Sequence, residues 1–209
     1  MFTGIVAAVG RITEVRALGG ADAGVRLVID AGALGLDDVA LGDSIAIQGA
    51  CMTVVAHAGN TFEVEVSRES LSMTAGLGEA GEVNLEKALS LSTKLGGHLV
   101  AGHVDGLGEV RAFSPAGESW ELVVRAPRRL AKYLAYKGSI TVNGVSLTVN
   151  RVTDGPEGAD FSINLISHTL AATTLKTLRP GTAVNLEIDL IARYVERMLS
   201  TAQGGSQPE

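Results

Sequence analysis

Two short strings in this chain of 209 residues place nucleophilic and hydroxyl side chains at matching positions. Cys51 and Thr53 follow an alternating apolar run that ends in Gln-Gly, and Ser146 and Thr148 follow a similar run that ends in Asn-Gly. Alternation of this kind is typical of a β-strand, in which every second side chain lies on one face, and an amide residue with glycine is common in tight hairpin turns. We therefore predict two hairpins, each of which presents two small polar groups that could hold a ligand.

Each of these residues also has an ordinary structural interpretation. A single cysteine such as Cys51 is more often a small buried hydrophobe than a nucleophile. Ser146 and Thr148 could be plain strand residues, because threonine suits strands. The recurrence of the same pair in both halves of the chain favours a ligand-binding role.

Histidines mark the start of the second half. His98 and His103 lie around Gly102, but no thiol or carboxylate cluster completes a ligand set, so we expect no metal site. His103 takes the place that Ile5 has in the first half, and a titratable group in only one copy of a repeated site is informative.

Asp189 is a second difference between the halves, because the first half has Ala88 at the matching position. A carboxylate in one copy alone could serve as an acid or base. The alternative is a helix N-cap, because an amphipathic stretch begins directly after Asp189.

The repeat that relates these residues covers nearly the whole chain. The offset between the two strings is constant at 95 residues (146 − 51 and 148 − 53). Further pairs occur in the same order in both halves: 4–6 with 102–104, 27–29 with 122–124, 62–66 with 161–165, and 83–86 with 184–187. The pattern predicts an internal duplication into two similar domains.

About six short β-rich runs separated by turn residues occur in each half, which predicts an all-β protein of small barrels or sandwiches. We place the first domain at residues 1–97 and the second at 98–188. Residues 189–209 form a third region, in which the apolar side chains Ile191, Tyr194, Val195, Met198 and Leu199 recur at helical spacing. We expect this helix to bury its apolar face against another subunit, or alternatively against its own barrel, and the tail after it to be disordered.

Composition limits the function classes. A net charge of −6, a pI near 5.3 and only 4% aromatic residues speak against nucleic-acid binding. We find no signal peptide, membrane-length apolar run or phosphate-binding loop. A lone Cys51 fits a reducing compartment, so we expect a cytoplasmic protein with no membrane or nucleic-acid partner.

The motifs together resemble the alpha chain family of riboflavin synthase. The strings that carry the resemblance are residues 1–6, 97–104, 143–149 and 191–197, and the likeness extends from residue 1 to about residue 200. It implies two tandem six-stranded Greek-key β-barrels, a C-terminal helix and a homotrimer joined by those helices. Each barrel would bind one molecule of 6,7-dimethyl-8-ribityllumazine, and no metal or organic cofactor would be needed.

The activity that the resemblance implies is a dismutation. One lumazine transfers a four-carbon unit to another, which yields riboflavin and 5-amino-6-ribitylaminouracil. The reacting pair would lie between the N-terminal barrel of one subunit and the C-terminal barrel of its neighbour. Lumazine synthase is a further partner that the resemblance suggests.

The resemblance also implies site residues. The catalytic candidates are Cys51, His103, Ser146 and Asp189, of which Cys51 is assigned to the N-terminal side and the other three to the C-terminal side. The substrate-binding candidates are Phe2, Gly4, Ile5, Val6, Ser44, Met52, Thr53, Glu65, Val66, Ser67, Ser70, Gly102, Val104, Lys137, Leu147, Thr148, Asn164, Leu165, Ile166 and Thr169. Phe2, Ser44, Thr53 and Ser70 are assigned to the N-terminal side, and Thr148 to the C-terminal side.

Two departures affect the N-terminal pocket. Ser70 stands where the family usually has threonine, and Ala50-Cys51-Met52 also varies the common pattern. The competing hypothesis is a non-catalytic relative that binds lumazine or flavin. The presence of all four catalytic candidates together favours the enzyme.

Overall fold

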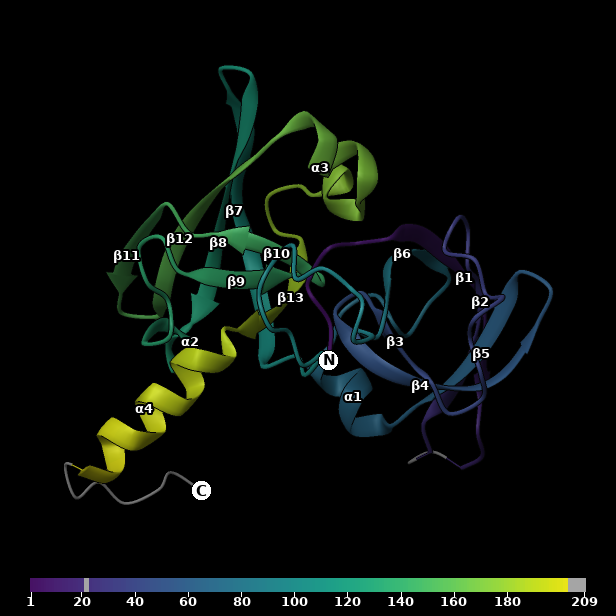
Figure 1. The fold of residues 1–209 in the computed structure, drawn as a ribbon. Helices are drawn as coiled ribbons and strands as arrows, with labels where there is room; N and C mark the ends of the chain where they lie inside the picture. The colour runs from purple at the N-terminus through teal and green to yellow at the C-terminus, as the bar shows by residue number, and fades with distance from the viewer. Residues whose placement is uncertain (21–22, 203–209) are drawn as a thin grey trace.

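The computed structural model describes residues 1–20 and 23–202. Figure 1 shows two β-rich halves side by side, with the C-terminal helix projecting from the second half. The predicted disordered tail, residues 203–209, lies outside the described residues.

The elements follow the expected repeat. In the first half they are β1 (Ala8–Ala17), β2 (Val25–Asp30), β3 (Ser44–Ile47), β4 (Ala50–Ala58), β5 (Thr61–Val66), α1 (Arg68–Met73) and β6 (Gly81–Lys87). In the second half they are β7 (Gly106–Ala116), β8 (Ser119–Pro127), α2 (Arg128–Ala131), β9 (Ser139–Val142), β10 (Val145–Thr148), β11 (Arg151–Gly155), β12 (Gly158–Leu165), α3 (Ser167–Ala172), the 3-10 turn η1 (Thr174–Thr177) and β13 (Ala183–Ile188). Helix α4 (Leu190–Ala202) ends the described chain.

The first half is a closed barrel with the strand order β1-β2-β5-β4-β3-β6. Its strands alternate, so that Met52 and Val54 of β4 are buried in the core while Thr53 between them is exposed. Cys51 lies on the same outward face as Thr53 and is half-buried. The predicted hairpin with two polar groups on one face is confirmed.

The second half differs from the predicted six-stranded barrel. It is a curled sheet of seven strands in the order β10-β9-β13-β7-β8-β12-β11. Strands β10 and β11 correspond to the two parts of β4, and Val149 and Asn150 between them belong to neither strand. The Val149 N–H donates to Gly138 just as the Val54 N–H donates to Asp43 in the first barrel, so this bond is common to both halves. The first barrel has only a register shift at the matching place, between Val54 and Ala56.

The two halves meet where their hairpin turns touch. Gln48 and Asn143 have φ values of 52° and 51°, and Gly49 and Gly144 follow with 90° and 79°, which is the pattern of a type I′ turn. A Cβ added to Gly49 would lie 2.7 Å from the backbone nitrogen of Gly144. Close turn-to-turn contact therefore requires glycine at this position.

Two asparagine side chains bridge the same junction symmetrically. Asn84 donates from Nδ2 to the carbonyl of Asn143, and Asn185 donates from Nδ2 to the carbonyl of Gln48, each over 2.9 Å. Asn84 and Asn185 are almost completely buried. The matched bonds give the junction a two-fold pattern that mirrors the sequence repeat.

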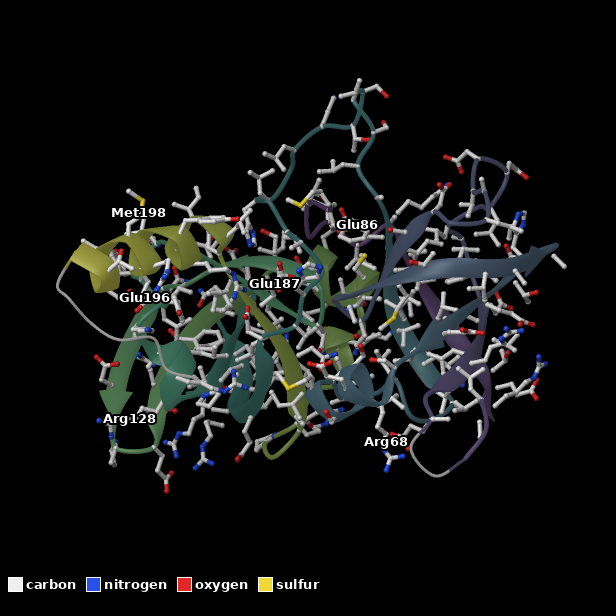
Figure 2. The ribbon with its side chains drawn as sticks, turned by 90° about the horizontal axis from the view of Figure 1, so that it is seen from below. Arg68, Glu86, Arg128, Glu187, Glu196 and Met198 are labelled. Atoms are coloured by element: carbon white, nitrogen blue, oxygen red, sulfur yellow. The ribbon has the colours of Figure 1, made fainter. Side chains whose placement is uncertain are left out.

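Helix α4 is tied to the second half through its polar side. Glu196 contacts Lys132 and accepts a hydrogen bond from the Tyr133 hydroxyl at 3.2 Å. The apolar side chains remain exposed, with Met198 at 71% and Ile191 at 66%. Figure 2 shows Met198 pointing away from the body of the molecule and Glu196 toward it. The predicted amphipathic helix is confirmed, whereas the alternative that its apolar face packs on its own barrel is wrong.

Among the described residues, no helix is long and apolar enough to cross a membrane.

Candidate functional site

The first site lies on the outer face of β4, between helix α1 and a segment from the second half of the chain. We call residues 98–104 the linker strap. A pocket of about 200 Å³ is lined by Ala50, Cys51, Met52, Glu69, Ser70, Met73, Thr74, Gly102, His103 and Val104. The Cys51 N–H donates to the carbonyl of Gly102 at 2.8 Å, so strap and strand form one wall.

Gly102 makes this contact possible. Its φ is +79°, and a Cβ there would lie 2.6 Å from the Cβ of Cys51. Any other residue would push the strap away from the strand. Phe2 is fully buried beside the same wall, in a small cluster with Ala46 and Cys51.

The second site repeats this arrangement around Ser146. We call residues 1–6 the N-terminal strap. The Ser146 N–H donates to the carbonyl of Gly4 at 2.7 Å, and a Cβ on Gly4, whose φ is +74°, would lie 2.6 Å from the Cβ of Ser146. Val6 packs against the core of the second half, just as Val104 packs against the core of the first.

His98 is a site residue that the sequence analysis missed. Its Nδ1 lies 2.8 Å from the Ser146 hydroxyl oxygen, and its Nε2 is buried with no hydrogen-bond partner. Burial lowers the pKa of His98, and the negative charge of Asp189 opposes this shift. The second site therefore brings Ser146, His98 and Asp189 together.

The structure corrects the placement of His103. The family resemblance implies that it lies with Ser146 on the C-terminal side, but it lines the pocket with Cys51. The reason is that the straps are exchanged: the linker strap belongs to the second half by sequence but completes the site on the first barrel. The sequence boundary at residue 97 therefore does not separate the two sites.

Most of the remaining N-terminal candidates lie on the elements that carry the first site, with two exceptions. Met52 and Ser70 line its pocket, and Ser44 lines a separate one. Ser44 lies opposite Thr53 in the β3–β4 ladder, so both share the outward face. Ser67 caps α1 by accepting from the Ser70 N–H at 3.0 Å. The exceptions are Val66, which is buried in the first core, and Glu65, which pairs with Arg26 at 2.6 Å.

The remaining C-terminal candidates are more scattered. Leu147 and Leu165 are buried in the second core, while Thr148 and Ile166 are exposed. Lys137 donates to the Asn150 side chain at 2.9 Å, Asn164 donates to Ser119 at 3.4 Å, and the Thr169 carbonyl accepts from Thr173. Ile5 is half exposed on the N-terminal strap.

Two buried glutamates were not assigned any role by the sequence analysis. Glu86 and Glu187 occupy matching positions at the ends of β6 and β13 and are 8% and 3% exposed. Burial raises the pKa of both carboxyls, that of Glu187 to about 7. The string Val-Asn-Leu-Glu, which places a glutamate at the same position of a strand in both halves, was the signal that could have identified them.

Among the described residues, no group of three or more His, Cys, Asp or Glu side chains could hold a metal ion. The polar groups at both sites are thiol, hydroxyl, imidazole and carboxylate groups. They can donate and accept hydrogen bonds and move protons.

The fold defines a class of protein: a duplicated β-protein whose first half is a closed barrel and whose second half is a curled sheet, with a candidate site on the outer face of each half. The lumazine binding domain matches twice, at residues 3–88 and 101–189. The chain belongs to the lumazine-binding domain family.

Proteins of named activity match this chain over nearly its full length. The chain is 43% identical to riboflavin synthase of Photobacterium phosphoreum over 203 residues, which cover 95% of this chain and 89% of that relative. It is 45% identical to riboflavin synthase of Mycobacterium tuberculosis over 208 residues, which cover 97% of this chain and all of that relative. Among solved structures, LumP complexed with riboflavin matches with a TM-score of 0.78 and 25% identity, over 90% of this chain and 99% of that one.

Proposed function

We infer that this protein has riboflavin synthase activity. The observation that carries the inference is the identity of 43–45% with riboflavin synthases over at least 95% of this chain. Two equivalent sites in one duplicated chain suit a reaction between two identical molecules. One 6,7-dimethyl-8-ribityllumazine transfers a four-carbon unit to a second, which gives riboflavin and 5-amino-6-ribitylaminouracil.

The two sites contribute different chemistry to this reaction. At the first site, Cys51 assists nucleophilic attack or proton transfer and His103 shuttles a proton. At the second site, Ser146 and Asp189 position the ring and move protons to or from it. Three observations support these roles. Cys51 and Ser146 each lie beside a strap glycine, and His103 lines the pocket that contains Cys51. The charge of Asp189 acts on His98, which contacts Ser146.

We further propose that the chain works as a homotrimer in the cytoplasm. The exposed apolar face of α4 supports association, because a contiguous apolar stripe of this kind is usually covered in a stable protein. The reacting lumazines would lie between the first half of one subunit and the second half of its neighbour. Because both lumazines would be held in a fixed orientation, their reaction becomes nearly unimolecular. This can lower the activation barrier by roughly several kcal/mol. Lumazine synthase is a further proposed partner.

The test is incubation of the purified protein with the lumazine alone, followed by riboflavin fluorescence. We expect riboflavin to form without added metal, nucleotide or flavin. The structural likeness to LumP favours a second candidate, a non-catalytic binding protein. Tight binding of the lumazine with no riboflavin formed would support that candidate and exclude the enzyme. Co-sedimentation with lumazine synthase tests the partner.

A further inference from the structure

The two straps cross between the halves of the molecule. They are joined to each other by a pair of backbone hydrogen bonds, from the Phe2 N–H to Val100 at 2.7 Å and from the Val100 N–H to Phe2 at 3.1 Å. Beyond this pair they diverge. The N-terminal strap continues to Ser146 in the second half, and the linker strap continues to Cys51 in the first.

A buried carboxylate holds each strap just before it reaches its site. Glu86 accepts from the Thr3 N–H at 2.6 Å and from the Gly4 N–H at 2.9 Å, on separate oxygens. Glu187 accepts from the Ala101 N–H at 2.7 Å and from the Gly102 N–H at 2.9 Å, again on separate oxygens. Figure 2 shows both glutamates in the central part of the molecule.

Each glutamate belongs to one half of the molecule, whereas the strap that it binds completes the site of the other half. Glu86 belongs to β6 of the first barrel, yet the strap that it binds presents Gly4 to Ser146 in the second half. Glu187 belongs to β13 of the second half, yet the strap that it binds presents Gly102 to Cys51 in the first barrel.

We propose that Glu86 and Glu187 are positioning residues for the substrate site of the opposite half. Each carboxyl group accepts from two adjacent backbone N–H groups, one on each oxygen, and this sets the distance between the strap glycine and the strand that carries the thiol or hydroxyl. Above about pH 7, where Glu187 is ionised in the folded protein because its pKa is about 7, its bonds to the strap are charge-assisted and therefore stronger than neutral ones. The description of these sites as substrate sites rests on the proposed function.

Glutamine is the informative replacement at both positions. It keeps the volume of glutamate, but its amide has only one oxygen, so its NH₂ group would face one of the two strap N–H donors. One hydrogen bond to the strap is lost, and the NH₂ donor of glutamine faces a backbone N–H donor. The volume that the side chain fills in the surrounding core is unchanged. Glu86 also accepts from the Thr3 hydroxyl at 2.7 Å, so Glu86→Gln and Glu187→Gln are controls for each other with respect to the two backbone N–H bonds.

The only cysteine of the chain allows one site to be probed alone. The alkylation rate of Cys51 by iodoacetamide reports on the first site and needs no substrate, so it is independent of the proposed function. We expect Glu187→Gln to raise this rate about tenfold, the consequence of losing one charge-assisted bond to the strap. We expect Glu86→Gln to leave it within about twofold. Phe2 also lies beside Cys51, but the backbone pair with Val100 holds it in place.

The reciprocal experiment places the thiol in the second site. In a Cys51→Ser, Ser146→Cys double variant, Glu86→Gln is expected to raise the alkylation rate and Glu187→Gln is not. If each glutamine instead affects the thiol in its own half, or neither variant changes any rate, the proposal is overturned. Should a glutamine variant fail to fold by circular dichroism, the corresponding aspartate variant, whose carboxylate is withdrawn by one methylene, carries the same expectation.

Discussion

At the scale of single residues, the two sites are related but chemically unequal. The first combines the thiol of Cys51 with His103. The second combines the hydroxyl of Ser146 with His98, which lies within reach of the Asp189 charge. A duplicated scaffold with different titratable groups at its two sites suits a reaction in which two identical molecules take different roles.

Asp189 has two roles that one pair of variants can separate. It caps α4 by accepting from the Ile191 N–H at 2.9 Å, and it is the proposed acid or base. Asp189→Ala removes both functions, whereas Asp189→Asn keeps an N-cap acceptor and removes the carboxylate. We expect both variants to lose at least about tenfold in turnover, or ~1.4 kcal/mol of transition-state stabilisation. Only the alanine variant should lose about 1 kcal/mol of stability.

Turnover and thermal unfolding measured on the same preparations distinguish these effects. Near-normal turnover of Asp189→Asn would remove Asp189 from the catalytic residues and leave it as a cap.

Glu187 makes stability depend on pH. Its pKa is raised to about 7 in the folded protein by burial, so the folded state favours the protonated form. The protonated Glu187 carboxyl therefore stabilises the folded state. This stabilisation is complete below about pH 4.5, the pKa of the carboxyl in the unfolded chain, and is lost as the pH rises through about 7. We expect the free energy of unfolding of the wild type to fall by up to about 3 kcal/mol over this range relative to Glu187→Gln.

Urea unfolding of both proteins between about pH 4.5 and 8 measures the difference. Parallel pH profiles for the two proteins would show that the carboxyl of Glu187 does not titrate in this window.

At the scale of elements, α4 is attached to the chain by its polar side and exposes its apolar side. The contacts of Glu196 with Lys132 and Tyr133 orient the helix, while Tyr194 and Leu199 stay exposed at 63% and 57%. An exposed apolar stripe that is held in a fixed direction is well suited to bind the same stripe of another copy.

Deletion of residues 191–209 should yield mainly monomer with both halves folded. A milder test is Met198→Glu, which places a charge in the apolar stripe, with Met198→Leu, which keeps the stripe apolar, as the control. Sedimentation should show dissociation for Met198→Glu only. A trimer that persists after the deletion would refute the role of α4.

At the scale of the whole molecule, the junction of the two halves depends on the contact between their hairpin turns. Gly49→Ala would force a Cβ to within 2.7 Å of the backbone of Gly144. Gly59 is a matched control, because it also has a positive φ, of 57°, but has open space around its Cβ position.

We expect Gly59→Ala to cost about 1 kcal/mol of stability from backbone strain alone. Gly49→Ala should cost roughly 1–3 kcal/mol more, because the turns must separate. Equal losses in denaturant unfolding would mean that the turn contact does not contribute to stability.

The sequence by itself was sufficient to predict the local structure and the repeat. Alternation over short runs predicted the strands of both halves, and the Gln48-Gly49 and Asn143-Gly144 pairs predicted the hairpins. Helical spacing after Asp189 predicted α4. These features depend on side-chain periodicity and turn chemistry, which are encoded over a few neighbouring residues.

Only the tertiary structure decided which half each strap completes. The sequence order of His103 suggested that it belongs with Ser146, but the exchange of the straps places it with Cys51 and leaves His98 beside Ser146. The interruption of the second-half strand at Val149 was likewise unpredictable from its alternation. The physical reason is that these outcomes depend on contacts between residues far apart in the chain, such as Glu187 with the strap backbone, and a local pattern contains no information about its distant partner.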